Sequence, residues 1–180
     1  MNAPKEMKVI FIGDAEAGKT FLISSFIFGY PVIPKKPILF GTYSRHIAYN
    51  NSTYKLRICD TYGSPEFMRL QEMSYLDADV MVLCIDGTDI ASLKNAERYA
   101  IQSKKARVPI VLCITKVDRG VKLSDSQLIS FKNKYRLNSV VKVSVYDKKS
   151  VEYAFEKMVD TSINDKFIES SYCGKIFSCC

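Results

Sequence analysis

The segment that decides the fold runs from Gly13 to Thr20 and reads GDAEAGKT. It matches the pattern G-x-x-x-x-G-K-[ST], in which glycines allow successive backbone N–H groups to wrap phosphate oxygens. An apolar run, Lys8–Ile12, precedes the segment, and a stretch with helical spacing, Gly18–Phe28, follows it. The N-terminus of that helix would direct a partial positive charge at the same place. The sequence therefore predicts a phosphate-binding loop between a strand and a helix.

A loop of this kind indicates a nucleotide but does not say which one. The Lys19 ammonium group would reach the β and γ phosphates, and the Thr20 hydroxyl would hold Mg²⁺. The residues predicted to contact the nucleotide in this part of the chain are Asp14, Ala15, Glu16, Ala17, Gly18, Lys19, Thr20 and Phe21.

A second motif, Asp60-Thr61-Tyr62-Gly63, follows the β-like run Tyr54–Cys59 and lies 40 residues after Thr20. An aspartate at the carboxyl end of a strand can hold Mg²⁺ through water, and a glycine there lets a backbone N–H approach a γ-phosphate. Thr20 and Asp60 are the predicted metal residues, and no other metal residue is predicted.

A third motif, Thr115-Lys116-Val117-Asp118, follows the apolar run Val108–Ile114. The Asp118 carboxylate can accept hydrogen bonds from N1–H and the 2-amino group of guanine, which adenine does not offer. The stem of Lys116 can pack flat over the ring. Ser144-Val145-Tyr146 ends the last predicted strand at the same edge of the sheet, where ligands bind in open α/β folds.

Strands alternate with helices along the whole chain, which predicts an α/β fold with a mostly parallel six-stranded sheet and helices on both faces. Ser44–Asn50 and Tyr54–Cys59 flank Asn51-Ser52, a plausible hairpin turn. The remaining strands are predicted at Val80–Ile85, Val108–Ile114 and Ser139–Val143, and the remaining helices at Glu66–Leu76, Ala91–Lys105, Ser124–Tyr135 and Lys148–Ser162. Gly29–Gly41, with three prolines, is predicted to be a long loop.

Composition narrows the function classes. The 180 residues are 47% apolar and 25% charged, which fits one folded domain. One histidine, His46, leaves no basis for a multi-histidine metal site. Cys59, Cys84 and Cys113 lie in apolar runs and are expected to be reduced core thiols. The net charge of +7 has no accompanying basic block with aromatic residues, so it favours an anionic membrane over nucleic acid.

The four motifs GDAEAGKT, DTYG, TKVD and SVY occur in the order and spacing of the Ras superfamily of small GTPases, which this chain resembles from about Lys8 to Ser162. Glu66–Tyr75 resembles the switch II helix of Rho and Rac proteins. The paired cysteines at the end resemble the Rab family. Ser144 lies only 26 positions after Asp118, and this stretch is too short for the insert helix of Rho proteins.

The resemblance implies a P-loop G domain over residues 1–165 that binds GTP and GDP with Mg²⁺. It implies guanine contacts from Tyr30, Thr115, Lys116, Asp118, Ser144, Val145 and Tyr146, and catalytic roles for Lys19, Gly63 and Ser64. The implied partners are a guanine nucleotide exchange factor, a GTPase-activating protein, effector proteins, and a dissociation inhibitor or escort protein. Ala15 stands where glycine is common, and its methyl group is expected to crowd an arginine from an activating protein.

Two departures from the family predict slow hydrolysis. The switch I threonine, which contacts Mg²⁺ and the γ-phosphate, should lie 18 residues after Thr20, and that position is Ile38. Thr42 would replace it only if the loop refolded. The glutamine that positions the attacking water should follow Gly63, and that position is Ser64, whose hydroxyl is shorter than a glutamine side chain.

Residues 166–180 are predicted to form a flexible tail, lipid-modified at Cys179 and Cys180. These cysteines do not fit the C-a-a-X pattern, but they resemble the Cys-Cys ends that receive two geranylgeranyl groups. Two lipid chains give stable anchoring, so we expect the protein at the cytoplasmic face of a membrane, with a cytosolic pool. An unmodified tail is the alternative.

Two functions remain open at this stage. The first is a slow GTPase that acts as a membrane-tethered switch in signalling, the cytoskeleton or vesicle traffic. The second is a hydrolysis-deficient GTP-binding module that recruits effectors. A P-loop kinase of similar length would not explain Thr115–Asp118.

Overall fold

The residues that the computed structural model describes, 3–33 and 39–176, contain a six-stranded sheet in the order β2-β3-β1-β4-β5-β6. The strands are β1 (Lys5–Ile12), β2 (Phe40–Tyr49), β3 (Ser52–Thr61), β4 (Val80–Asp86), β5 (Ile110–Thr115) and β6 (Ser139–Lys142). All neighbouring pairs are parallel except β2 with β3. The predicted α/β fold with a mostly parallel sheet is therefore confirmed.

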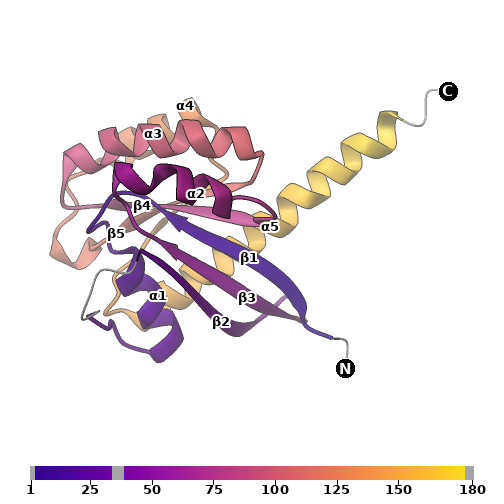
Figure 1. Ribbon diagram of the computed structural model, residues 1–180, viewed down its shortest axis with the longest axis horizontal. Helices are drawn as coiled ribbons and strands as arrows, with labels where there is room; N and C mark the ends of the chain where they lie inside the picture. The colour runs from indigo at the N-terminus through magenta and orange to yellow at the C-terminus, as the bar shows by residue number, and fades with distance from the viewer. Residues whose placement is uncertain (1–2, 34–38, 177–180) are drawn as a thin grey trace.

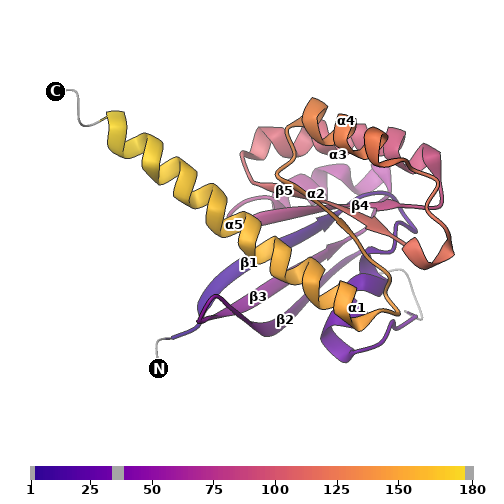
Figure 2. The same ribbon diagram turned by 180° about the vertical axis from the view of Figure 1, so that it is seen from behind.

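Helices cover both faces of the sheet (Figure 1, Figure 2). One face carries α1 (Lys19–Phe28) and α5 (Lys148–Ile176), and the other carries α2 (Met68–Ser74), α3 (Ile90–Ala106) and α4 (Asp125–Tyr135). Successive residues of a strand point to opposite faces. Phe11 of β1 accordingly packs in the core under α1 and α5, whereas Ile10 packs in the core under α3 and α4.

The β2–β3 hairpin is present, but its turn lies one residue earlier than predicted. Tyr49 pairs with Ser52, so Asn50 and Asn51 form the two-residue loop, with φ values of 45° and 57°. Such a turn needs positive φ at both central residues, which asparagine tolerates better than most side chains. Thr42 lies within β2, where it pairs with Cys59.

Helix α5 is longer than predicted. The sequence pattern ended it near Ser162, whereas the helix continues to Ile176 and extends beyond the end of the sheet (Figure 1, Figure 2). The backbone of residues 166–176 is thus helical, although no regular structure was predicted there. The lipid modification of Cys179 and Cys180 remains a prediction on residues outside the described ranges.

The parallel strands place the site. The carboxyl ends of β1, β3, β4 and β5 meet at one edge of the sheet, and each is followed by one of the segments identified from the sequence or by the start of a helix. Cys59, Cys84 and Cys113 are buried, reduced thiols, as predicted. Among the described residues, no helix combines the length and apolar character needed to cross a bilayer.

Candidate functional site

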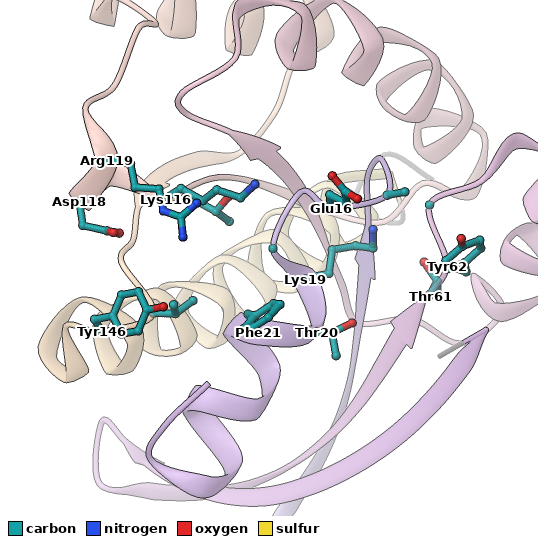
Figure 3. Close-up of a pocket in the computed structure, with 15 residues that line it drawn as sticks. Glu16, Lys19, Thr20, Phe21, Thr61, Tyr62, Lys116, Asp118, Arg119 and Tyr146 are labelled. Carbon is teal, nitrogen blue, oxygen red and sulfur yellow. The ribbon is translucent and has the colours of Figure 1, made fainter. Parts of the chain in front are cut away.

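A pocket of about 510 Å³ lies at this edge of the sheet. Figure 3 shows Lys116, Asp118, Arg119 and Tyr146 towards one end, Thr61 and Tyr62 at the other, and Lys19 and Thr20 between them. Twelve of the predicted nucleotide or catalytic residues line it: Ala15, Glu16, Gly18, Lys19, Thr20, Phe21, Gly63, Thr115, Lys116, Asp118, Val145 and Tyr146. The fold thus brings the four motifs to one cavity, while the individual roles remain predictions.

The phosphate-loop segment closes around the Lys19 side chain. Nζ of Lys19 donates to the carbonyl oxygens of Gly13, at 2.9 Å, and Asp14, at 2.6 Å. Gly18 has a φ of 83°, in the left-handed region that glycine adopts without strain. Burial lowers the pKa of Lys19, although nearby Cys84, Asp60 and Asp14 oppose this shift. A bound phosphate would favour the charged ammonium group.

Thr20 lines the pocket and contacts Asp60, which lies behind the pocket wall. The Thr20 hydroxyl donates to Oδ2 of Asp60 at 2.6 Å. Oδ1 of Asp60 is buried and, within the described part of the chain, has no hydrogen-bond partner. Burial raises the pKa of Asp60, while Thr20 and Lys19 act in the opposite direction. A hydroxyl beside a carboxylate with a free oxygen is a donor set that fits Mg²⁺ and its waters.

Gly63 packs directly on the phosphate loop. A Cβ atom at this position would collide with the backbone of Asp14 and Ala15, so a glycine is required. Its carbonyl oxygen accepts a hydrogen bond of 3.0 Å from the hydroxyl of Tyr99. Ser64 follows it, but its side chain is not among the groups that line the pocket. The Ser64 carbonyl instead accepts from the N–H of Phe67 at 3.1 Å, at the start of a short helical turn.

The third motif is tied to the phosphate loop by a buried hydroxyl. The Thr115 hydroxyl shares its one hydrogen between the carbonyl oxygens of Ala17, at 2.9 Å, and Ile85, at 3.0 Å. Lys116 has a φ of 57°, and its Nζ forms an ion pair of 2.6 Å with Asp86. Burial opposes ionisation of Asp86, but hydrogen bonds from Lys116 and Thr88 outweigh it and lower the pKa. The pair fixes the direction of the Lys116 stem along the pocket wall.

The last loop closes the end of the pocket beside Asp118. The Ser25 hydroxyl donates to the carbonyl of Val145 at 3.0 Å, and the N–H of Tyr146 donates to Oγ of Ser144 at 3.3 Å. The first bond holds the loop against α1, and the second lies within the loop. Tyr146 is exposed, and Asp118 lies opposite it across the pocket mouth (Figure 3).

Several predicted residues lie behind the pocket or away from it. Asp60, Ala17 and Ser144 support its walls through the bonds described above. The Asp14 carboxylate turns towards α3, where Arg98 binds it. Tyr30 follows the end of α1 and is 62% exposed, outside the residues that line the pocket. Ile38, Cys179 and Cys180 lie outside the described residues.

Three pocket residues were not predicted: Thr61, Tyr62 and Arg119. Thr61 and Tyr62 are the two variable positions inside the Asp60–Gly63 motif, and Arg119 directly follows Asp118. In the sequence, these three residues are marked by their position next to motif residues. The chemistry of the motif did not require any particular side chain at these places.

The fold, the phosphate loop and the pocket define a nucleotide-binding α/β protein of the P-loop class, and comparison with known proteins gives the family. The family model described as "Ras family" matches residues 8–164, and the chain belongs to this family. Its similarity is to Rho-type members. The chain is 32% identical over 142 residues to the GTP-binding protein RHO3 of Saccharomyces cerevisiae. The aligned region covers 77% of this chain and 62% of that protein.

Two further relatives show the same pattern. The Ras-like GTP-binding protein RHO1 of Entamoeba histolytica is 34% identical over 94 residues, 52% of this chain and 44% of that protein. The Ras-like GTP-binding protein RhoL of Drosophila melanogaster is 25% identical over 165 residues, 87% of each chain. The chain thus spans less than two thirds of the length of RHO1 and RHO3.

Proposed function

We propose that this chain binds GTP and GDP with Mg²⁺ and acts as a molecular switch with slow GTP hydrolysis. The observation that carries the proposal is the single pocket that joins the phosphate loop, Gly63 and the Thr115–Asp118 motif. The names of its Rho-type relatives, which are GTP-binding proteins, support the same ligand. Measuring the nucleotide bound to the purified protein, with and without Mg²⁺, tests the proposal. Protein that binds neither GDP nor GTP would refute it.

Each group in the pocket has a defined task in this proposal. Lys19 would neutralise phosphate charge, and the backbone N–H groups at the start of α1 would bind phosphate oxygens. Thr20 and Asp60 would hold Mg²⁺, which when bound neutralises charge on the phosphate oxygens and stabilises the negative charge that develops during phosphoryl transfer. Asp118 and Lys116 would select and orient the base. Binding of the nucleotide by these groups requires no catalytic side chain beside the γ-phosphate.

Slow hydrolysis follows from what this chain lacks beside Gly63. Ser64 has a short side chain, and it does not line the pocket. Positioning a nucleophile by a polar side chain contributes a large share of the barrier reduction in this reaction class. Ile38 cannot act as a metal ligand, because its side chain has no donor atom. Both positions support slow turnover, and they equally favour the second candidate, a hydrolysis-deficient module that binds GTP and recruits effectors.

Replacing Ser64 with glutamine is expected to accelerate hydrolysis of preloaded GTP about tenfold, because a longer amide would reach a water near the phosphates. Single-turnover phosphate release measures the rate. The matched control is Ser130→Gln on α4, an exposed serine outside the pocket, which should leave the rate unchanged. An unchanged rate in Ser64→Gln would mean that the missing glutamine does not limit turnover.

We further propose a membrane tether and the usual regulators of such a switch. Cys179 and Cys180 would carry the lipids, which would place the protein at the cytoplasmic face of a membrane with a cytosolic pool. An exchange factor, effectors, and a dissociation inhibitor or escort protein are the expected partners, whereas Ala15 disfavours an activating protein that inserts an arginine. Mass spectrometry of protein made in eukaryotic cells tests the tether, and two unmodified thiols would contradict it.

A further inference from the structure

Helix α3 contacts both phosphate-binding segments of the pocket through two consecutive residues. Arg98 forms an ion pair with Asp14 of the phosphate loop, and Tyr99 donates its hydroxyl hydrogen to the carbonyl of Gly63. The two side chains also contact each other: Nη2 of Arg98 lies 3.2 Å from the Tyr99 hydroxyl, and the guanidinium lies 4.8 Å from the centre of the Tyr99 ring. None of the four motifs includes either residue.

The Arg98 contact bears on the groups that hold Lys19. Asp14 directs its carboxylate towards Arg98, while its carbonyl oxygen accepts from Nζ of Lys19 at 2.6 Å and from the N–H of Ala17 at 3.3 Å. The ion pair with Arg98 restrains the Asp14 side chain, and it therefore also orients the peptide group whose carbonyl oxygen binds Lys19. The Asp14 side chain is 20% exposed and that of Arg98 is 36% exposed, so the pair is partly shielded from water and is less weakened by salt than a surface pair.

The Tyr99 contact bears on Gly63. Tyr99 is 1% exposed, and its hydroxyl is placed by the surrounding core on one side and by Arg98 on the other. Gly63 has no side chain that could hold it, and it lies against the backbone of Asp14 and Ala15. The hydrogen bond of 3.0 Å from Tyr99 is thus a specific restraint on the direction of the Gly63 peptide.

We propose that Arg98 and Tyr99 are positioning residues for the nucleotide site, with Arg98 fixing the phosphate loop through Asp14 and Tyr99 fixing Gly63. This inference rests on the proposed nucleotide function. Arg98 then affects contacts that GDP and GTP share. Tyr99 holds the Gly63–Ser64 peptide group, which directly follows the Gly63 N–H that would approach a γ-phosphate, so its loss should affect GTP and not GDP.

Dissociation rates of fluorescent GDP and of a non-hydrolysable GTP analogue test this division of roles. Arg98→Gln is expected to release both nucleotides about tenfold faster. Asp14→Asn should have the same effect, and the double variant should be no faster than either single variant, because the two residues act as one pair. Arg98→Lys, which keeps the charge, should recover most of the loss. Tyr99→Phe should release only the GTP analogue faster, by about threefold.

Lys94→Gln is the matched control, since Lys94 is exposed on α3 one turn before Arg98 and outside the pocket. It should leave both rates unchanged. A general loss of stability would accelerate the dissociation of both nucleotides in every variant. The proposal would therefore be overturned if Arg98→Gln and Tyr99→Phe each accelerated the dissociation of both nucleotides to the same extent. Additive effects of Asp14→Asn and Arg98→Gln would also overturn it.

Hydrogen exchange of the nucleotide-free protein separates this inference from the proposed function. Arg98→Gln should accelerate amide exchange in residues 14–18, and Tyr99→Phe in residues 61–64, with little change elsewhere. If the wild-type protein binds no nucleotide, the proposed function fails, and these local changes still report whether α3 positions the two segments. Unchanged exchange in both segments would refute the positioning role whether or not nucleotide binds.

Discussion

Asp118→Asn is expected to lower the affinity for GDP about a hundredfold and to raise the affinity for xanthosine diphosphate. The Asp118 carboxylate lines the pocket and offers only hydrogen-bond acceptors, which match N1–H and the 2-amino group of guanine. Asparagine offers one acceptor and one donor, so its donor would face the guanine amino group. Xanthine carries an oxygen in place of that amino group, and the pairing is restored.

Competition between unlabelled nucleotides and a fluorescent guanine nucleotide measures both affinities. Asp125→Asn is a suitable control, because Asp125 begins α4, pairs with Lys142 and lies outside the pocket, and the substitution should change neither affinity. If Asp118→Asn bound GDP as tightly as the wild-type protein, Asp118 would not select the base. The guanine specificity in the proposed function would then lose its main support.

The fold was largely predictable because its signals are local. Val80–Ile85 and Val108–Ile114 are uninterrupted apolar runs, as expected for strands buried on both faces, and they became β4 and β5 with small shifts at their ends. The phosphate-loop pattern also located the start of α1 to within one residue. In each case, the side chains that specify the element are neighbours in the sequence, so the pattern contains the required information.

The features that were missed depend on residues far apart in the chain. Arg98 and Asp14 are 84 positions apart, and Lys116 and Asp86 are 30 apart, so no local pattern predicts either ion pair. The length of α5 was missed for a different reason. The sequence from Asp165 onward loses the apolar periodicity that marks a packed helix, and the last turns of the helix extend past the sheet (Figure 2).

Gly63→Ala is expected to destabilise the protein by about 3 kcal/mol, since the added Cβ would collide with the backbone of Asp14 and Ala15. The obstacle is main chain and not the end of a flexible side chain, so one of the two segments must shift. For a chain of this size, the loss corresponds to a fall in the melting temperature of about 8 °C. A shift of the phosphate loop would also move the carbonyl groups that hold Lys19, so GDP affinity should fall with stability.

Gly29→Ala separates this collision from the general cost of replacing glycine. Gly29 has a φ of 85° and a ψ of 0°, in the left-handed region, and no heavy atom lies within 4 Å of the added Cβ, so it suffers only the backbone strain of about 1 kcal/mol for an L-residue in that region. Thermal unfolding of the nucleotide-free variants should therefore show a larger loss for Gly63→Ala than for Gly29→Ala. An equal or smaller loss would mean that the Asp60–Gly63 segment moves away from the phosphate loop at little cost. In that case the Tyr99 hydrogen bond to Gly63 would not restrain the segment, and the positioning role of α3 would be confined to Arg98.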